Sequence, residues 1–273
     1  MSAKFFEAER FDGDRHSPKD EWVVEEGPLQ IRVNGKPFTV TLRTPGADRQ
    51  LVMGLLFAEG LVENPSDILS LEEKPSLDET TLWSATLVKD IAPEKLPARS
   101  LASTSSCGLC GKTEWESSAV DGDASQCVPT EGQLSLSLLD RCFRELGAHQ
   151  ELFARTGGCH AAAVFSLDGT LLAFGEDAGR HNAVDKAIGD LWSRGKLGDA
   201  KLMCVSGRVA YEIATKAKRA GFEIIAAVSA PSSMAVDYCR ENGITLLGFC
   251  RGDRATAYSH SERLIAAEAI TVQ

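Results

Sequence analysis

The sequence predicts an α/β protein (α+β overall) whose C-terminal half forms an αβα sandwich around a mixed sheet. Helix-like and strand-like segments alternate in this half, which favours parallel strands joined by crossover helices. Two apolar runs around Asp168-Gly169 indicate a hairpin, which adds an antiparallel pair of strands. Hydrophobic residues make up 43% of the 273 residues, a share that is ordinary for a globular chain with a sizeable core.

Residues 1–130 are predicted to form a smaller, β-rich N-terminal domain. Residues up to about Glu21 are polar and are expected to be loosely held. Two strand-like runs between Trp22 and Leu42 flank Asn34-Gly35, a strong signal for a hairpin. Asp48 is expected to cap a helix with one apolar face, and Gly60 to end it. A β-rich stretch follows this helix.

Residues 131–273 are predicted to form the αβα domain. Glu212 and Lys216 are expected to form an ion pair one turn apart on one of its helices. In chain order we expect a helix ending at Gly147, strands at 161–165 and 170–174, a helix near 184–191, a strand at 202–205, a helix around 212–216, a strand at 223–229, a helix at 232–241, a strand at 244–249 and a last helix with Leu264 and Ile265.

Two thiols stand in a loop-like segment toward the end of the predicted N-terminal domain. Glycine follows both Cys107 and Cys110, serine and threonine precede them, and no apolar period is present, which is typical of an exposed, mobile loop. Lys112 favours the thiolate over the thiol, and the thiolate is the reactive form. We therefore predict that Cys107 and Cys110 carry the chemistry of this protein.

Other interpretations of this Cys-x-x-Cys pair stay open. Half of a zinc site would need two more ligands, and the downstream Cys127 and Cys142 are not a second close pair. A thioredoxin-like pair should lie where a strand enters a helix, and neither element clearly flanks the loop. The N-terminus lacks the long apolar run of a signal peptide, and no stretch approaches a membrane-spanning length. We therefore expect a cytoplasmic protein with reduced thiols, no resident metal and no structural disulfides.

Polar clusters follow three of the predicted strands, at positions 206–208, 229–233 and 250–254. In such sheets ligands bind beyond the carboxyl ends of the strands, helix starts hold anions, and arginines can clamp phosphates. The net charge of -10 argues against a broad basic surface for nucleic acid but leaves room for a local phosphate pocket. The candidate ligand residues of these clusters are Arg208, Ser229, Ser232, Arg251 and Arg254.

Residues 175–186, which read Gly-Glu-Asp-Ala-Gly-Arg-His-Asn-Ala-Val-Asp-Lys, form the most distinctive long segment. Acidic residues suit the start of a helix, whereas Arg180, His181 and Lys186 do not. We expect these three side chains to face a ligand or a subunit interface. His160, after a glycine-rich run, is more often an ordinary satisfied histidine than a ligand.

Five motifs resemble the FdhD family of formate dehydrogenase accessory proteins, and the resemblance covers nearly the whole chain. They are Ser-Cys-Gly-Leu-Cys-Gly, Thr-Gly-Gly-Cys-His-Ala-Ala, Glu-Asp-Ala-Gly-Arg-His-Asn-Ala-Val-Asp-Lys, Ser-Gly-Arg and Ser-Ala-Pro-Ser-Ser. The resemblance implies a sulfurtransferase that takes persulfide sulfur from a cysteine desulfurase. It implies that the sulfur passes to the molybdenum cofactor with two molybdopterin guanine dinucleotides, which formate dehydrogenase requires. It also implies a homodimer and a C-terminal domain similar to cytidine deaminases.

Carried over by motif, Cys107 would bear the persulfide and Cys110 would be the assisting thiol. The segment Phe249, Cys250, Arg251, Gly252, Asp253 and Arg254 would contribute to the guanine dinucleotide site. Family members often have Asn-x-Tyr after this segment, and here Thr256 stands in place of the asparagine.

Three rival functions belong to other classes. The weakest is a general thiol–disulfide oxidoreductase, which should reduce or oxidise generic protein disulfides, and we predict that this protein does not. A zinc-dependent deaminase would need His-x-Glu and a later Pro-Cys-x-x-Cys, whereas Ala161 and Ala162 follow His160 and the Cys pair lies upstream of it. A non-catalytic chaperone that only escorts the molybdenum cofactor would use the same strand-end clusters. Only the two thiols separate that chaperone from a sulfurtransferase.

Overall fold

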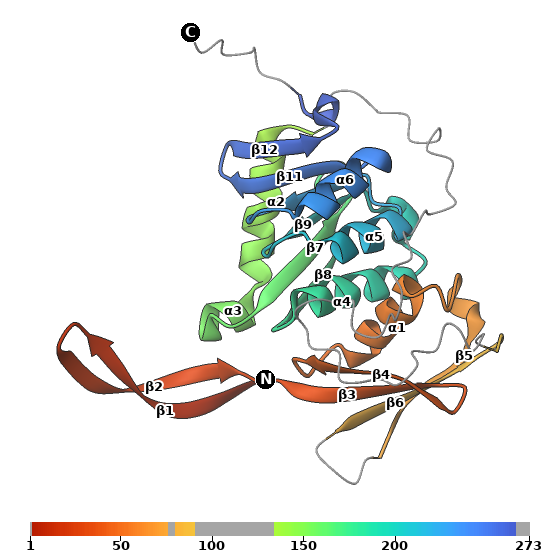
Figure 1. Ribbon diagram of the computed structural model, residues 1–273, viewed down its shortest axis with the longest axis horizontal. Helices are drawn as coiled ribbons and strands as arrows, with labels where there is room; N and C mark the ends of the chain where they lie inside the picture. Colours follow the sequence, from red (N-terminus) through yellow and green to blue (C-terminus); the bar gives the residue numbers. More distant parts are fainter. Residues whose placement is uncertain (1, 76–79, 91–133, 266–273) are drawn as a thin grey trace.

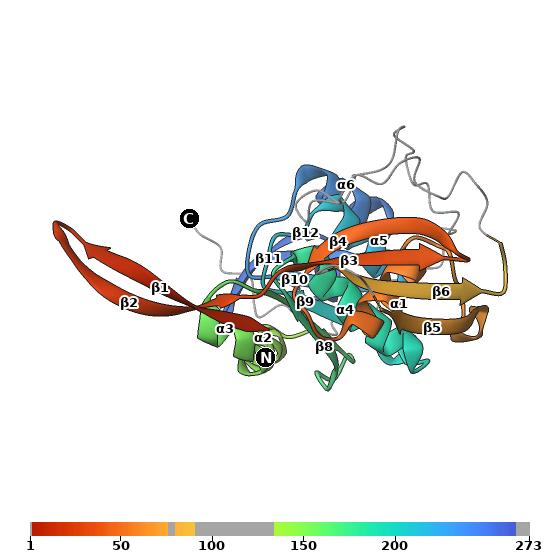
Figure 2. The same ribbon diagram turned by 90° about the horizontal axis from the view of Figure 1, so that it is seen from below.

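The structure is a computed structural model that describes residues 2–75, 80–90 and 134–265. These residues form a two-stranded ribbon, a four-stranded sheet in the order β4-β3-β6-β5, and a six-stranded sheet in the order β12-β11-β10-β9-β7-β8. In Figure 1 the ribbon projects as an arm from the body of the molecule, and in Figure 2 the same arm extends sideways. The mixed α/β class predicted from the sequence is confirmed.

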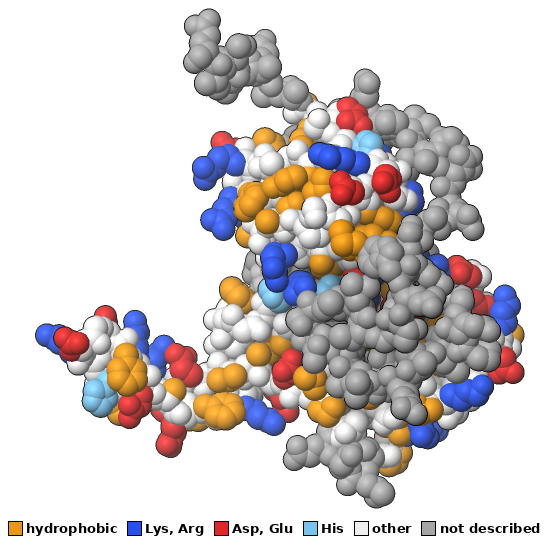
Figure 3. All heavy atoms as spheres, in the orientation of Figure 1, with side chains coloured by type: hydrophobic (Ala, Val, Ile, Leu, Met, Phe, Trp, Pro, Cys, Tyr) orange, Lys and Arg blue, Asp and Glu red, His pale blue; other side chains and the backbone are white. Residues whose placement is uncertain are grey.

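The arm consists of β1 (Ala3–Asp12) and β2 (Arg15–Val24), paired antiparallel over their whole length. The expectation that residues up to Glu21 are loosely held was therefore wrong. Every residue of the two arm strands is at least partly exposed, and charged and hydrophobic side chains lie together on the arm in Figure 3. Neither face therefore shows the apolar alternation that usually reveals a strand. Phe5 and Trp22 still meet across the two strands, with ring centroids 5.5 Å apart.

The four-stranded sheet begins with the predicted hairpin, which is confirmed. Asn34 and Gly35 both have positive φ, 48° and 76°, as the tight turn of such a hairpin requires. Asp48 is the first residue of the following helix rather than its cap, and its carboxylate pairs with Arg43 at 2.7 Å. The elements of this unit are β3 (Gly27–Val33), β4 (Lys36–Arg43), α1 (Asp48–Ala58), a 3-10 turn (Pro65–Asp67), β5 (Ile68–Lys74) and β6 (Thr81–Leu87).

The six-stranded sheet is mixed, as predicted. Strands β9, β10 and β11 are parallel, whereas β7 is antiparallel to β8 and β9, and β12 is antiparallel to β11. The carboxyl ends of β8 to β11 and the amino ends of β7 and β12 therefore share one edge, named here the strand-end edge. The strands are β7 (His160–Phe165), β8 (Leu171–Asp177), β9 (Leu202–Val205), β10 (Ile224–Ala227), β11 (Thr245–Arg251) and β12 (Arg254–Ser259).

Helices cover both faces of this sheet and give the predicted αβα layering (Figure 1). One core cluster joins α2 to one face, and the other joins α4, α5 and α6 to the opposite face. The helices are α2 (Leu136–His149), α3 (Glu151–Thr156), α4 (Arg180–Ser193), α5 (Tyr211–Arg219) and α6 (Ser233–Glu241), with a 3-10 turn at Leu197–Asp199. None of the helices in the described part of the chain is long and apolar enough to cross a membrane.

The expected helix at Leu264 and Ile265 was wrong. The chain forms β12 and a single 3-10 turn (Ser261–Arg263) instead. The Leu264 backbone then forms a parallel bridge with Leu134, and its apolar side chain packs against the core cluster that contains α2. Helix α2 also continues two residues beyond Gly147.

The four-stranded unit and the αβα layers share one hydrophobic core, which runs through the contact of α1 with α4. A Cβ atom on Gly54 would lie 2.0 Å from the carbonyl oxygen of Asp185, and one on Gly189 would lie 1.9 Å from that of Gln50. The two helices therefore touch backbone to backbone. The predicted domain boundary at residues 130 and 131 lies outside the described residues and stays a prediction.

Candidate functional site

The strand-end edge collects the polar clusters predicted from the sequence. Arg208 follows β9, Ser229 and Ser232 follow β10, and the segment 249–254 joins β11 to β12. Since β9, β10 and β11 are parallel and adjacent, these groups lie at the same end of the sheet. Their role as ligand residues stays a prediction, but the fold brings them to one place.

The starts of α5 and α6 face the same edge, because each helix follows a strand that ends there. The hydroxyl of Ser232 accepts a hydrogen bond from the Ala235 N–H at 3.3 Å and so caps α6. The remaining N–H groups of the first turn have no partner inside the helix, which makes such a start favourable for anions.

The turn from β11 to β12 presents an aromatic ring and two cations. Phe249 has a φ of 53° and is 51% exposed, and the ladder to β12 is interrupted between Gly248 and Arg251. A left-handed, exposed aromatic residue is strained, and such strain concentrates at functional sites. Arg251 and Arg254 pair across the two strands, and both side chains are exposed.

Cys250, in the same segment, turns into the core instead. It is 3% exposed, and burial raises the pKa of its thiol to about 11. The fold uses this side chain for packing, so only its backbone remains available to a ligand.

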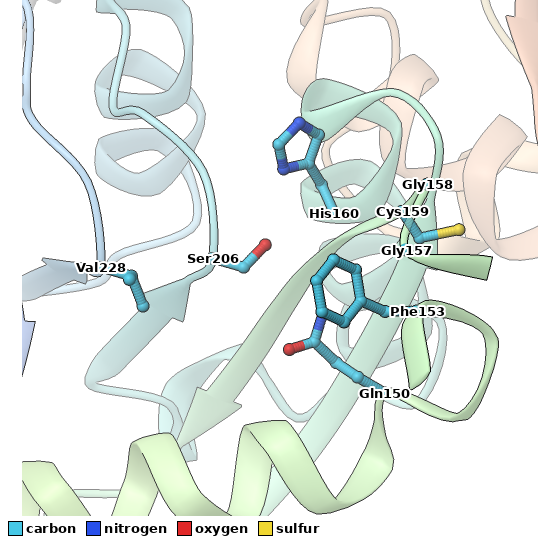
Figure 4. A pocket seen from close by; sticks show the side chains of 8 residues that line it. All are labelled: Gln150, Phe153, Gly157, Gly158, Cys159, His160, Ser206 and Val228. Atoms are coloured by element: carbon cyan, nitrogen blue, oxygen red, sulfur yellow. The ribbon is translucent and has the colours of Figure 1, made fainter. Parts of the chain in front are cut away.

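A pocket of about 430 Å³ lies at the strand-end edge, between the sheet and the α2–α3 corner. Figure 4 shows the side chains of His160, Ser206 and Phe153 around a common space, whereas the sulfur of Cys159 points away from it. The lining residues are Gln150, Phe153, Gly157, Gly158, Cys159, His160, Ser206 and Val228.

Hydrogen bonds from neighbouring strands fix the walls of this pocket. The hydroxyl of Ser206 accepts a hydrogen bond from the Ala161 N–H at 2.9 Å. This bond joins the end of β9 to β7 at the mouth of the pocket. The carboxylate of Glu176 accepts from the backbone N–H groups of Leu152 and Phe153, at 3.2 and 2.7 Å. Glu176 therefore holds the first turn of α3, and with it the Phe153 ring.

His160 lies against Gly207, since a Cβ atom there would be 3.1 Å from the His160 Nδ1. Burial lowers the pKa of the His160 imidazole, and the nearby guanidinium groups of Arg180 and Arg208 lower it further. At neutral pH the ring is therefore uncharged, with one N–H donor and one nitrogen acceptor.

Lys186, predicted to face a ligand or an interface, is buried in a different cluster. Its ammonium group pairs with Asp177 at 2.8 Å and donates to the carbonyl oxygens of Thr44 and Glu176 at 2.8 and 3.1 Å. Because these partners use its three N–H donors and it is 3% exposed, the structure gives it a structural role.

The same cluster ties the four-stranded unit to α4. Asp177, which is fully buried, accepts hydrogen bonds from the Thr44 N–H at 3.0 Å and the Asn182 amide at 3.1 Å. The Asn182 amide also donates to the carbonyl oxygen of Leu42 at 2.8 Å. We call Thr44, Asp177, Asn182 and Lys186 the junction cluster.

Glu212 and Lys216, predicted to pair with each other, each also have a partner on α4, and the Glu212 charge is one of those that raise the pKa of Lys216. Lys216 binds the carboxylate of Asp185 at 2.6 Å, and Glu212 lies 3.5 Å from the His181 Nε2. Burial raises the pKa of Asp185 to about 6, even though Lys216 opposes that shift. His181 is 8% exposed, so it stands at the first turn of α4 but mostly below the surface.

Cys107 and Cys110 lie outside the described residues, as do Cys127 and Lys112. Within the described ranges, no group of three or more histidine, cysteine, aspartate or glutamate side chains is placed to hold a metal ion.

Sequence reasoning missed Gln150 and Phe153 as pocket residues. The available signal was weak: Phe153 is an apolar residue in a short helix that ends at a Gly-Gly pair, and it remains 45% exposed in the fold. Ser206 was expected in a strand-end cluster, but its place in a pocket beside His160 follows from the antiparallel pairing of β7 with β9.

The model of the FdhD/NarQ family matches residues 24–265. The protein named sulfur carrier protein FdhD from Mycobacterium tuberculosis is 41% identical over 263 residues, covering 92% of this chain and 94% of the relative. The protein of the same name from Sulfurisphaera tokodaii is 36% identical, covering 97% of this chain and all of the relative. The crystal structure of a formate dehydrogenase accessory protein from Desulfotalea psychrophila has the same fold, with a TM-score of 0.74, 20% identity and coverage of 97% of this chain and all of that one.

Proposed function

This chain belongs to the FdhD/NarQ family, and from that premise we propose that it is a sulfurtransferase for the molybdenum cofactor of formate dehydrogenase. It takes sulfur from the persulfide of a cysteine desulfurase. It then delivers the sulfur to the cofactor with two guanine dinucleotides, which is its substrate and cargo. The relatives named sulfur carrier proteins support the carrier role.

The first step is a thiolate exchange at Cys107. Its sulfur attacks the terminal sulfur of the desulfurase persulfide, a new S–S bond forms at Cys107, and the desulfurase cysteine leaves as a thiolate. The oxidation level is the same on both sides, so no external oxidant is needed. Lys112, five residues along, favours the thiolate that this step requires.

Cys110 offers a way to release the sulfur. Its thiolate can attack the Cys107 sulfur of the persulfide, which forms a Cys107–Cys110 disulfide and expels sulfide. The disulfide retains the two-electron oxidation that the persulfide carried. A thiol reductant must therefore reduce it to two thiols before the next cycle. If Cys110 only tunes Cys107, the persulfide passes to the cargo without a disulfide.

The strand-end edge is the observation that carries the cargo half of the proposal. Exposed arginines at 208, 251 and 254 stand at one end of the sheet, close to the starts of α5 and α6. Guanidinium groups bind phosphates with two parallel hydrogen bonds, and helix starts add partial positive charge. A dinucleotide that carries several phosphates suits this edge.

Intact mass spectrometry tests the carrier half. The protein is incubated with a cysteine desulfurase and cysteine, beside a Cys107→Ala variant and a Cys204→Ala control. Cys204 is a fully buried thiol whose pKa burial raises well above its ordinary value, so it should not react. We expect a sulfur adduct that a reductant removes, in the wild type and the control but not in Cys107→Ala.

A contrary result would separate the two candidate functions. If the desulfurase becomes loaded and no adduct appears on this chain, the protein is a chaperone that escorts the cofactor without carrying sulfur. Intact formate dehydrogenase activity in cells that contain only Cys107→Ala would lead to the same conclusion.

A further inference from the structure

The arm formed by β1 and β2 concentrates exposed apolar side chains. Five of the eleven large hydrophobic residues that remain exposed in the described part of the chain lie on it, namely Phe5, Phe6, Phe11, Trp22 and Val23. The two strands form a sheet of their own, and none of the other described strands pairs with them. An isolated two-stranded ribbon is only marginally stable in water, so the arm is an element that a partner would stabilise.

The arm is anchored to the body at its base, beside α3. The guanidinium carbon of Arg155 lies 3.6 Å from the centroid of the Trp22 ring, and a Cβ atom on Gly158 would lie 2.9 Å from the Val24 side chain. Phe153 of the same helix lines the pocket at the strand-end edge, so the arm leaves the body beside that edge (Figure 1). Ten residues of extended strand reach about 33 Å from this anchor.

The register of the two strands gives the arm a face that is both acidic and aromatic. Phe5 lies opposite Trp22, and Glu7 lies opposite Asp20. Since alternate residues of a strand share a face, three carboxylates and three large aromatic rings lie together, and no lysine or arginine of these two strands lies among them. This surface, named here the acidic face, contains Phe5, Glu7, Glu9, Phe11, Asp20 and Trp22.

The opposite face of the arm has the opposite balance of charge. Its four basic and two acidic residues are Lys4, Arg10, Arg15, Lys19, Asp12 and Glu21. Lys19 and Glu21 also form an ion pair on this face, whereas the carboxylates of Glu7 and Asp20 face each other. A binding partner can therefore distinguish the two faces of the arm by charge.

The acidic face is unfavourable for the free protein. Glu7 and Asp20 lie directly opposite each other, and like charges in this arrangement destabilise a sheet. Phe11 is 69% exposed even though it stacks on His16 with ring centroids 5.6 Å apart. Exposed aromatic rings with a charged surround are typical of a surface that a partner covers.

Charge and edge chemistry narrow the choice of partner. A second copy that stacked its own acidic face on this one about a twofold axis would bring carboxylates against carboxylates. Pro18 and the charged residues along both strands discourage pairing with a further strand at the edges of the arm. The partner surface is therefore cationic, with apolar groups that receive the rings of Phe5 and Phe11.

We propose that the acidic face docks on the cationic entrance of the cofactor cavity in formate dehydrogenase that still lacks its molybdenum cofactor. This proposal rests on the proposed function. A cofactor with two guanine dinucleotides carries several phosphates, so the enzyme that receives it needs basic side chains at the entrance. The desulfurase passes on a single sulfur atom and needs no such surface.

Docking through the arm would hold the strand-end edge beside that entrance, because the arm is anchored next to this edge. Charged groups at the rim of an interface speed the encounter of the partners, and buried aromatic groups hold them together. The cofactor and the acidic face are both negative and are both attracted to the entrance. Once the cofactor has entered, its phosphates neutralise the basic side chains, so transfer itself favours release of the arm.

Surface plasmon resonance tests the proposal with immobilised formate dehydrogenase, purified with its cofactor and from cells that do not make the cofactor. The analyte is the full chain, either wild type or with Glu7→Lys and Asp20→Lys together. The matched control has Asp12→Lys and Glu21→Lys, which change the net charge equally but on the opposite face of the same arm. Phe11→Ala removes an exposed ring without a change of charge.

We expect Glu7→Lys with Asp20→Lys to weaken binding to the cofactor-free enzyme by about tenfold or more, because like charges then meet across the interface. The control pair should stay within about twofold of the wild type, and Phe11→Ala should weaken binding by about fivefold. Raising the salt from about 0.1 to 1 M shortens the screening length from about 10 to 3 Å and should weaken the wild type most. The enzyme that contains cofactor should bind the wild type less tightly than the cofactor-free enzyme does.

The persulfide measurement separates this proposal from the proposed function. Loading of Cys107 by the desulfurase should be equal in the wild type and in the variant with Glu7→Lys and Asp20→Lys. If loading falls and binding to formate dehydrogenase does not, the arm docks on the desulfurase and this proposal is wrong, although the chain still carries sulfur. If the wild type is loaded but binds neither form of the enzyme, the docking proposal fails and the carrier half of the proposed function stands.

Three further results would overturn the proposal. Equal weakening in the two double variants would mean that net charge matters and the acidic face does not. Equal affinity for the enzyme with and without cofactor would place the docking surface away from the entrance. A dimer that becomes a monomer on Glu7→Lys with Asp20→Lys, measured by analytical ultracentrifugation, would assign the acidic face to contact with a second copy.

Discussion

The junction cluster and the strand-end edge both contain cationic side chains, but these side chains differ in burial and in role. In the junction cluster every charge is buried and has a partner, as Lys186 and Asp177 do at 3% and 0% exposure. At the strand-end edge the arginines at 208, 251 and 254 are exposed. Buried pairs hold the fold together because a lone buried charge is costly, whereas exposed cations cost little and remain available for a ligand.

Residues of the distinctive segment 175–186 belong to both regions. Asp177 and Lys186 face inward and join the four-stranded unit to α4, and Glu176 holds α3. The first turn of α4, with Arg180 and His181, stands at the strand-end edge because β8 ends there at Asp177. A run of polar residues in one motif therefore does not mark one site.

The largest effect is expected from Lys186→Met, which leaves Asp177 buried without its cation. We expect the free energy of unfolding to fall by about 3–5 kcal/mol, measured by urea denaturation. The matched control is Lys196→Met, because Lys196 pairs with Asp199 on the surface with both side chains more than half exposed. An exposed pair of this kind is worth ~0–1 kcal/mol. Equal losses in both variants would contradict the structural role of the junction cluster.

The next largest effect should come from Gly54→Ala at the contact of α1 with α4. The added methyl group would clash with the backbone of Asp185, and overpacking of this kind costs about 1–3 kcal/mol. Gly147→Ala in α2 meets no atom within 4 Å and should stabilise the protein by about 0.5–1 kcal/mol. Thermal unfolding of the two variants should therefore shift in opposite directions, and a shared direction would show that the two helices can separate freely.

At the strand-end edge, Arg208→Ala and Arg251→Ala should each weaken GDP binding by about tenfold, because a hydrogen bond to a charged group is lost. Stability should change by less than ~0.5 kcal/mol, since both side chains are exposed. Titration calorimetry with GDP measures the first quantity, and Arg144→Ala, an exposed arginine on α2, is the control. Unchanged GDP binding would remove Arg208 and Arg251 from the site.

The smallest effect is a pH dependence at the pocket. The pKa of His160 is lowered in the folded protein, so the ring stays neutral at pH 7 and gains a proton only as the pH falls below its ordinary range near 6.5. We expect the contribution of His160 to the free energy of unfolding, measured by urea denaturation at each pH, to be constant from pH 7 to 8 and to decline in acid, because the unfolded chain takes up the proton more readily than the folded one. The decline should disappear in His160→Gln, and its persistence there would assign it to another group.

The sequence predicted much of the fold because the C-terminal half follows simple patterns. The alternation of helices and strands, the hairpin at Asp168-Gly169 and the meeting of the strand ends follow from apolar periodicity and turn residues. The arm was missed because both of its faces are exposed and polar residues interrupt the apolar ones. The last element was mistaken for a helix because Leu264 and Ile265 are apolar neighbours, a feature that strands and helices share.

The candidate site was predicted less well, and for a physical reason. Exposure decides whether a lysine is a ligand residue or a structural one, and the exposure of Lys186 depends on Thr44, which is far away in the sequence. Gln150 and Phe153 belong to the pocket because α3 folds back against β8 through Glu176. The sequence around Phe153 has no local pattern that predicts this contact.

The junction cluster can form only late in synthesis, because its residues come from distant parts of the chain. Lys186 and Thr44 are 142 residues apart, and a ribosome adds roughly 5–20 residues per second. Thr44 therefore waits about 7–28 s for Lys186 to be synthesised. During that time the apolar face of α1 has no α4 to cover it, so this face stays exposed until α4 is synthesised.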